Sequence, residues 1–248
     1  MKRLEYVIGG VVVRLFIAVM PPKSIVARFI QCSQLVPLID NRLSGAKWVR
    51  PQAAHLTLSF LGEVEGRRVS LVKDACRQVA ADHVASAVGL GELGAFPQIG
   101  RARTLVVELD RACSTLKSIA EDLSSHLRRL GFVCDPKPFR PHLTLARVRE
   151  PVDLRGQWNI LAQRCHAVLH TCDDSATNNT SCQRILDGVI PVAGRGAVSS
   201  ASLVKHTGAT VTSEGQGMWT VGEFHLYRSE LFPSGPRYSI LSSYTLSP

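Results

Sequence analysis

Residues 139–147 read Phe-Arg-Pro-His-Leu-Thr-Leu-Ala-Arg, and the centre of this stretch recurs earlier in the chain, where residues 54–58 read Ala-His-Leu-Thr-Leu. The two histidines, His55 and His142, are 87 positions apart. Both copies alternate polar and apolar residues, which predicts a β-strand with His and Thr on one face and Leu on the other.

His55 and His142 are the candidate catalytic residues. Neutral imidazole accepts a proton and imidazolium donates one, and both forms are accessible near pH 7. If the two strands face each other across a groove, one histidine can act as base and the other as acid. The hydroxyls of Thr57 and Thr144 can then hold an oxyanion. A single histidine in a strand is more often a packing residue, but two copies with matched flanks favour catalysis. The pattern does not assign which histidine is the acid.

Residues 139–147 and 55–62 resemble the paired signatures of the 2H phosphoesterase superfamily, in its bacterial and archaeal RNA 2′,3′-cyclic phosphodiesterase (2′-5′ RNA ligase) branch. Residues 14–19 and 224–231, with Arg237-Tyr238 after them, are similar to that branch too. The resemblance implies an α+β fold of two pseudo-symmetric lobes, each an antiparallel sheet with outer helices, around a central groove.

The same resemblance implies an activity. It is hydrolysis of a terminal RNA 2′,3′-cyclic phosphate to a 2′-phosphate by two-histidine acid–base catalysis, without metal or other cofactor, and reversible 2′-5′ RNA ligation is a further activity of the branch. The expected partners are RNA with 2′,3′-cyclic phosphate ends, or cyclic nucleotides. The alternative is a module of the same fold that binds RNA ends or nucleotides with little or no turnover. An intact histidine pair favours catalysis, because Arg or Lys would serve anion binding equally well.

Seven further residues are expected to bind the substrate, and they lie in or near the quoted signatures: Thr57, Thr144, Arg140, Arg147, Tyr227, Ser229 and Tyr238. Tyr227 and Ser229 share one face of a predicted strand. An edge strand with solvated polar residues explains these two equally well.

The chain repeats itself beyond the motif. Arg14 matches Arg103 as His55 matches His142, and each half reads strand, helix, His-x-Thr strand and helix. This predicts a pseudo-twofold molecule whose two motifs meet at the axis. We expect one bilobal domain over residues 1–248, with 1–13 as an N-terminal extension and 173–217 as an insertion whose composition also permits disorder.

The predicted elements follow from hydrophobic periodicity and from turn residues. The predicted extended elements are a strand at 14–20, an extended segment at 84–96, a strand at 103–110 and a hairpin of 219–229 with 238–246. The first predicted helix begins at Pro21-Pro22 and ends at Pro37, with Val26, Phe29, Ile30 and Ser33 inward, and the second has Val69, Val72, Cys76, Val79 and Ala80 inward. The third ends at Gly131, with Leu116, Ile119, Ala120, Leu123, Leu127 and Leu130 inward, and the fourth has Leu154, Trp158, Leu161, Cys165 and Val168 inward.

Charge and cysteine content indicate which partner and which cellular location to expect. A formal net charge of +9 and a pI near 9.5 suit a polyanionic partner such as RNA. Seven cysteines without regular spacing do not form a disulfide framework, which favours reduced thiols and a cytoplasmic location. Arg14 interrupts the apolar run near the N-terminus, so that we expect no signal peptide and no membrane association. The chain is expected to be a monomer.

Two further motifs resemble a dinucleotide-binding site and a zinc site but lack the sequence context that these sites need. Residues 89–94 satisfy the G-x-G-x-x-G dinucleotide pattern, but Phe-Pro-Gln follows where that pattern needs a helix. Cys165, His166, His170, Cys172 and Cys182 lack the paired spacing of a zinc site, so no metal is expected.

Overall fold

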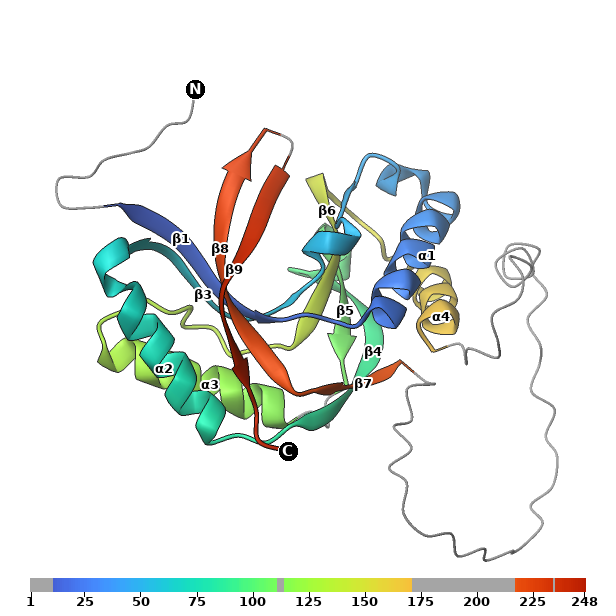
Figure 1. Cartoon of the computed structure of the whole chain (residues 1–248). Helices are drawn as coiled ribbons and strands as arrows, with labels where there is room; N and C mark the ends of the chain where they lie inside the picture. Colours follow the sequence, from blue (N-terminus) through green and yellow to red (C-terminus); the bar gives the residue numbers. More distant parts are fainter. Residues whose placement is uncertain (1–10, 111–113, 171–216, 234) are drawn as a thin grey trace, which may run out of the picture.

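The two copies of the motif lead into strands of two different β-sheets (Figure 1). The computed structural model describes residues 11–110, 114–170, 217–233 and 235–248. β3 (Leu56–Glu65) is at the edge of a four-stranded sheet with the order β3-β1-β8-β9, and β6 (His142–Val152) belongs to a five-stranded sheet with the order β2-β6-β5-β4-β7. All neighbouring strands are antiparallel, which confirms the predicted α+β architecture.

The other strands are β1 (Val12–Val19), β2 (Lys47–Trp48), β4 (Ser86–Phe96), β5 (Ala102–Leu109), β7 (Met218–Val221), β8 (Glu223–Phe232) and β9 (Gly235–Thr245). The α-helices are α1 (Lys23–Ile39), α2 (Val69–Ala81), α3 (Ser114–Arg129) and α4 (Trp158–Leu169). Short 3₁₀ turns are formed at Asn41–Leu43, Pro51–Ala53, Gly66–Arg68 and Ile99–Arg101.

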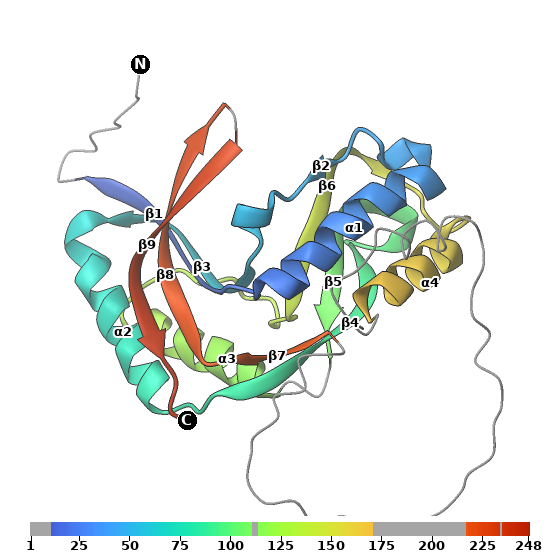
Figure 2. The same ribbon diagram turned by 45° about the vertical axis from the view of Figure 1, so that its right-hand side comes forward.

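The helices form two pairs on the outer sides of the sheets (Figure 2). α2 packs against α3, and this pair contacts β3, β8 and β9 of the four-stranded sheet. α1 packs against α4, and this pair contacts β4 and β6 of the five-stranded sheet. The predicted outer helices are therefore confirmed, and the inner sides of the sheets are left to form a groove.

The two halves of the sequence exchange elements between the lobes. β1 lies in the four-stranded sheet, but the helix after it, α1, covers the five-stranded sheet; β5 lies in the five-stranded sheet, but α3 after it covers the other. A late strand of each half also joins the sheet of the other half: β4 of the first half pairs with β5 of the second, and β8 of the second half pairs with β1 of the first. Each lobe is thus built from both halves, and neither half can form a lobe alone.

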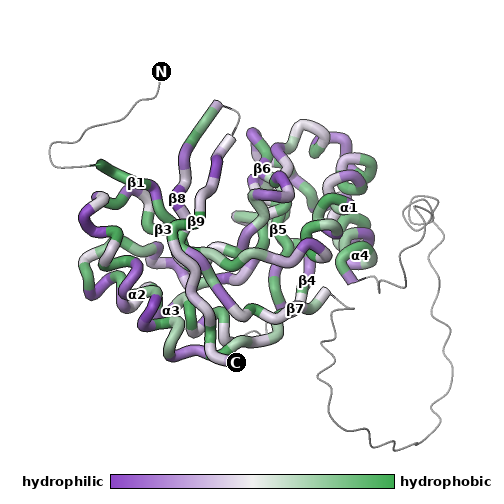
Figure 3. The backbone as a smooth tube through the Cα atoms, in the orientation of Figure 1, coloured by the Kyte–Doolittle hydropathy of each residue, from purple (hydrophilic) through white to green (hydrophobic). Residues whose placement is uncertain are grey.

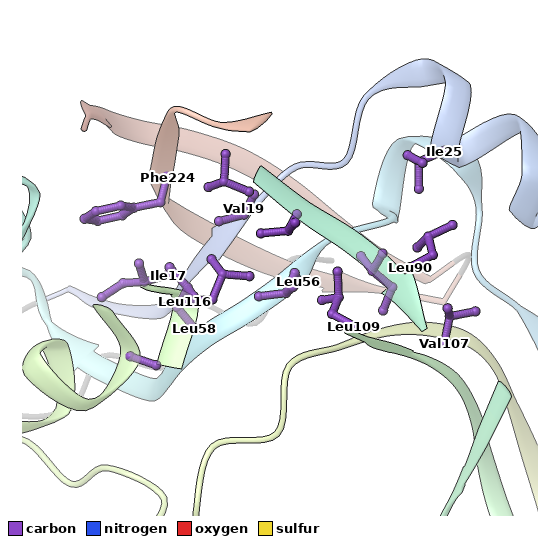
Figure 4. Close-up of a cluster of buried hydrophobic side chains, with 14 of the residues drawn as sticks. Ile17, Val19, Ile25, Leu56, Leu58, Leu90, Val107, Leu109, Leu116 and Phe224 are labelled. Carbon is purple, nitrogen blue, oxygen red and sulfur yellow. The ribbon is translucent and has the colours of Figure 1, made fainter. Parts of the chain in front are cut away.

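One continuous hydrophobic core joins the lobes. Figure 4 shows part of it, with side chains from both sheets and from α1 and α3: Ile17, Val19, Ile25, Leu56, Leu58, Leu90, Val107, Leu109, Leu116 and Phe224. Along the helices, hydrophobic and hydrophilic residues alternate, as expected of elements with one buried and one solvated face (Figure 3).

The apolar residues of each motif anchor its strand in this core. Leu56 and Leu143 are fully buried, and Leu58 and Leu145 nearly so. Burying one leucine side chain contributes about 1.5–3 kcal/mol, and a slip of one residue would turn these leucines into the groove. The leucines therefore fix the opposite face of each strand, with its His and Thr, toward the groove.

Both motifs contain a β-bulge at the same position. In the ladder between β1 and β3 the register shifts after Thr57, so that Leu58 has no opposite residue. In the ladder between β5 and β6 it shifts after Thr144, so that Leu145 has none. A bulge reverses the alternation of side chains beyond it. Consequently Arg147, three residues after Thr144, returns to the groove face.

Some predicted details are wrong. α1 does not end at Pro37 but continues to Ile39, and its buried face holds Ile25, Arg28 and Cys32 with Phe29, whereas Ile30 is exposed. Pro37 is tolerated because it lies in the last turn, where its missing N–H removes one hydrogen bond while Leu35 and Val36 stay buried. Leu130 is exposed, since α3 ends one residue before it and Gly131 has a positive φ of 75°.

The predicted strand at 219–229 is two strands. β7 pairs with β4 in the five-stranded sheet, and after Gly222 the chain enters the other sheet as β8. The hairpin of β8 with β9 is confirmed. Residues 89–94 lie within β4, which continues to Phe96, and no α-helix follows where the dinucleotide pattern needs one, so they form no dinucleotide-binding turn.

Two expected segments fall largely outside the described residues. These are the insertion at 173–217, of which only Gly217 is described, and the extension at 1–13, of which residues 11–13 are described. β1 begins at Val12, two residues before the predicted start of the strand.

Candidate active site

The two motif histidines are held by the same backbone contact. Nδ1 of His55 lies 2.7 Å from the carbonyl oxygen of Ala53, and Nδ1 of His142 lies 2.7 Å from the carbonyl oxygen of Arg140. Because a carbonyl oxygen only accepts hydrogen bonds, Nδ1 carries the proton in both neutral rings. Nε2 is then the nitrogen that can accept a proton from, or donate one to, a ligand.

Both histidines line one cavity of about 270 Å³ between the lobes. We call it the catalytic cavity; it is lined by Lys47, Trp48, Val49, Arg50, Ala53, His55, Thr57, His142, Thr144, Arg147, Gly235, Pro236 and Tyr238. Among the described residues, the lining includes three permanent cations, Lys47, Arg50 and Arg147, and no Asp or Glu. This described lining therefore offers cations and hydroxyls to an anionic group.

Arg147 is a cation that acts on both histidines, and it comes from the second motif only. Its side chain lowers the pKa of both His55 and His142, so it lies close enough to act on both rings. Its Nη1 is 3.4 Å from the hydroxyl of Thr104, on the strand beside it. The equivalent position in the first motif is Phe60, which faces Phe16 across the ladder and carries the guanidinium of Arg14 over its ring at 5.0 Å.

The pKa of each histidine is lowered from the ordinary imidazole value of 6.5. Burial is the largest cause for both, because desolvation disfavours the charged ring. The hydrogen bonds to Ala53 and Arg140 act in the opposite direction, and the positive charge of Arg147 adds to the lowering. His142 further lowers the pKa of His55, so that the two rings resist being charged together.

Aromatic rings surround His55. Its ring lies 4.9 Å from that of Phe16 and 5.3 Å from that of Tyr238, the latter edge-on. Phe16 is itself stacked on Tyr227 at 5.0 Å, with only 12° between the planes. Burial raises the pKa of Tyr238, so its phenol stays protonated near neutral pH and can donate a hydrogen bond into the cavity.

Charged residues surround His142. Its ring packs edge-on against the ring of Phe96 at 5.0 Å, and the guanidinium of Arg140 lies 4.9 Å from the centre of the Phe96 ring. Arg140 also donates a short hydrogen bond to Glu108, which is directly opposite His142 in the ladder of β5 and β6. Glu108 raises the pKa of His142, and the two arginines at positions 140 and 147 lower it.

The structure brings six of the nine predicted site residues together in the catalytic cavity: His55, Thr57, His142, Thr144, Arg147 and Tyr238. Arg140, Tyr227 and Ser229 do not line it. Arg140 is engaged with Glu108 and Phe96, and Tyr227 is buried behind Phe16. Ser229 is half-buried and lies opposite Tyr238 in the hairpin.

Several lining residues were not predicted. Lys47 and Trp48 form β2, which pairs with β6 opposite Arg147 and Ala146. Arg50 follows after Val49 and immediately precedes the turn at Pro51–Ala53 that leads to His55. A two-residue strand leaves no periodicity to detect, but the run of basic and aromatic residues just ahead of the first motif was a usable signal.

Within the part of the chain that the structure describes, no three His, Cys, Asp or Glu side chains are grouped so that they could hold a metal ion. Cys172 and Cys182 lie outside that part. None of the described helices is long and apolar enough to cross a membrane.

Comparison with known proteins gives a family match over more than half of the chain. Residues 30–106 and 107–172 match the family model described as LigT like Phosphoesterase. Several relatives carry the name RNA 2′,3′-cyclic phosphodiesterase, among them proteins of Aquifex aeolicus, Thermotoga maritima and Thermus thermophilus. The Aquifex aeolicus protein is 29% identical over 45% of this chain and 59% of its own length, and the Thermotoga maritima protein is 32% identical over 48% and 63%. The Thermus thermophilus protein is 25% identical over 94% of this chain and 90% of its own length.

Solved structures show the same fold. A Thermus thermophilus protein superposes with a TM-score of 0.61 at 23% identity, covering 94% of this chain and 97% of that one. Escherichia coli LigT complexed with 3′-AMP superposes with a TM-score of 0.60 at 20% identity, covering 96% and 99%. At these identities the likeness concerns the fold, and it extends over nearly the whole of each chain.

Proposed function

The chain belongs to the LigT-like phosphoesterase family, and on that premise we propose that it hydrolyses the terminal 2′,3′-cyclic phosphate of RNA to a 2′-phosphate. The observation that carries the proposal is the matched pair of imidazoles. Both hold Nδ1 on a backbone carbonyl, and both line one cavity whose described lining residues include cations and no carboxylate. The relatives named RNA 2′,3′-cyclic phosphodiesterase support the choice of substrate.

The reaction needs one proton on the histidine pair. One imidazole accepts a proton from water through Nε2 as the water oxygen bonds to phosphorus. The bond from phosphorus to the 3′-oxygen breaks, and the other imidazole gives that oxygen its proton. The products are a 2′-phosphate and a 3′-hydroxyl. The histidine pair still carries one proton, which is now on the imidazole that acted as the base.

The remaining cavity residues stabilise charge. Arg147 faces the negative charge that grows on the non-bridging oxygens, and the hydroxyls of Thr57 and Thr144 donate hydrogen bonds to the same oxygens. The phenol of Tyr238 is a further donor. These residues and the two imidazoles supply both proton transfer and charge stabilisation, and we infer that the reaction proceeds without a metal ion.

The same arrangement would carry out ligation. If an RNA 5′-hydroxyl replaces water, its oxygen bonds to phosphorus, the bond to the 3′-oxygen breaks, and a 2′-5′ linkage results. The two imidazoles exchange protons as they do in hydrolysis. Ligation therefore requires no residue beyond the catalytic cavity, only room for a second RNA end.

The test is incubation of the protein, with a chelator present, with an RNA oligonucleotide that ends in a 2′,3′-cyclic phosphate. The expected product ends in a 2′-phosphate. A product ending in a 3′-phosphate would mean that the 2′-oxygen leaves, which contradicts the proposal. Tight binding without turnover would instead identify an RNA-end binding module.

A sulfur-substituted substrate would assign the two roles. When sulfur replaces the 3′-oxygen, the leaving group needs no proton, so loss of the acid does little harm while loss of the base remains severe. The variant among His55→Ala and His142→Ala that recovers most on this substrate lacks the acid. Equal recovery by both would show that the two histidines do not hold separate roles.

A further inference from the structure

A second cavity opens beside the catalytic cavity, at the tip of the hairpin formed by β8 and β9. It has a volume of about 300 Å³, and we call it the hairpin cavity. Its lining residues are Arg50, Gln52, Ala53, Phe232, Gly235, Pro236, Arg237 and Tyr238. In Figures 1 and 2 the hairpin projects from the four-stranded sheet.

The two cavities share a wall. Arg50, Ala53, Gly235, Pro236 and Tyr238 line both of them. Because the ring of Tyr238 stands edge-on to that of His55 at 5.3 Å, the hairpin cavity begins one side chain away from the reacting groups. A substrate bound at the histidines can therefore continue into it.

The hairpin cavity is basic and partly aromatic. Arg50 and Arg237 line it, and the part of its lining that the structure describes includes no Asp or Glu. The guanidinium of Arg237 lies 4.9 Å above the ring of Phe232, which holds its plane by a cation–π contact. Glu230, opposite Arg237 in the ladder, accepts a hydrogen bond from Arg228 at 3.2 Å. These features suit a phosphate joined to a planar base.

The chemistry of the substrate fixes which part of an RNA can reach this cavity. In a terminal 2′,3′-cyclic phosphate both the 2′- and the 3′-oxygen are bonded to the phosphorus between the histidines. The rest of the chain can leave only through the 5′-oxygen of the same ribose. The first group along that path is a phosphodiester, and the next is the preceding nucleotide.

We infer that the hairpin cavity is a subsite for the nucleotide that precedes the cyclic phosphate. Arg237 and Arg50 bind the connecting phosphodiester, and the base of that nucleotide stacks on Phe232. The inference rests on the proposed function and narrows the substrate to oligoribonucleotides, for which a cyclic mononucleotide is a poor substitute. No sequence preference is expected, because stacking and phosphate contacts are largely indifferent to the base.

The test compares kcat/KM for a nucleoside 2′,3′-cyclic monophosphate and for a dinucleotide with the same 3′-terminal nucleotide. The wild-type protein should favour the dinucleotide by about tenfold or more. Arg237→Gln and Phe232→Leu should each lower this ratio several-fold. Arg77→Gln is the matched control, because Arg77 is an exposed arginine on the outer helix α2 and its ion pair with Asp74 is solvated.

Two outcomes would overturn the inference while leaving the proposed function intact. One is a wild-type ratio near one; the other is an Arg237→Gln variant that slows both substrates equally. Absence of turnover on either substrate would instead count against the proposed function. Binding of the labelled dinucleotide then still tests the subsite, since it should be weaker for Arg237→Gln than for Arg77→Gln, and equal binding by the two variants would overturn the inference.

Discussion

The two His-x-Thr motifs have the same backbone and different neighbours. In both, Nδ1 of the histidine is bonded to the carbonyl two residues earlier at 2.7 Å, and a bulge follows the threonine. Around His55 the neighbours are the aromatic rings of Phe16 and Tyr238. Around His142 they are charged, with Glu108 and Arg140 in contact with each other.

The repeat accounts for the shared backbone of the two motifs, and the neighbouring residues account for their differences. The repeated backbone presents two equivalent Nε2 atoms to one cavity. The differing neighbours make the rings unequal, because Glu108 raises and Arg140 lowers the pKa of His142, while His55 has aromatic rings beside it. Two rings in unequal surroundings do not share a proton evenly.

The largest effect should come from removing either imidazole. His55→Ala and His142→Ala should each lower kcat/KM by roughly 10²–10⁴-fold, the usual contribution of a general acid or base. Because the two act as a unit, the double variant should be little worse than either single one. Hydrolysis of a cyclic-phosphate RNA measures this, with thermal unfolding to confirm the fold.

His126→Ala is the control for that comparison, since His126 lies on α3, away from the groove, and its Nδ1 is likewise near a backbone carbonyl oxygen, that of Asp122. It should keep wild-type turnover. Near-normal hydrolysis by either motif variant would show that catalysis does not depend on the pair.

The next effect should separate Arg147 from its counterpart Phe60. Arg147→Ala removes the cation that we propose faces the phosphate, and loss of a hydrogen bond between charged groups should slow the reaction roughly 10- to 150-fold. Phe60→Ala alters the equivalent position of the first motif, where the side chain is 45% exposed, and should change the rate little. Steady-state kinetics on the same RNA would measure the loss in each of the two variants. Comparable losses in both variants would mean that the bulge does not direct Arg147 to the substrate.

The threonines should matter less than the histidines. Thr57→Val and Thr144→Val each remove one neutral hydrogen-bond donor of similar shape, which should cost roughly 2- to 10-fold in kcat/KM. The repeat predicts similar losses at the two positions. A loss as large as that of a histidine variant would show that a threonine takes part in proton transfer.

Much of this architecture could be read from the sequence, for physical reasons that differ between elements. Strands with leucine on one face and His and Thr on the other are specified locally by alternation. α2 was predicted with its correct buried face because its apolar residues recur at helical spacing. The exchange of α1 and α3 between lobes leaves no local trace, because it depends on long-range packing.

The site shows the same limit. His55, His142 and their threonines follow from the motif, but Lys47 and Arg50 reach the cavity through a two-residue strand and a turn. Arg140 lies beside the second histidine in sequence, yet an ion pair with Glu108 on another strand keeps its side chain out of the cavity lining. Simple alternation would also place Arg147 on the wrong face, because the bulge before it is visible only in the ladder.

The smallest effect should be electrostatic. Glu108→Gln removes the carboxylate beside His142 and leaves the charge of Arg140 uncompensated, so the pKa of His142 should fall while that of His55 changes less. Both side chains are partly solvated, so the shift should be modest and should shrink with added salt. NMR titration of the two imidazoles would measure it. A rise in the pKa of His142 would contradict the described surroundings of this ring.

The pH dependence of kcat/KM tests the central claim, that two histidines work with one proton between them. Above the higher pKa the pair has lost its acid, and below the lower pKa it has lost its base, so the profile should be bell-shaped. Because burial lowers the pKa of both rings from 6.5, the maximum should lie on the acid side of neutrality. A profile with a single limb, or one flat between about pH 5 and pH 8, would contradict catalysis by this pair.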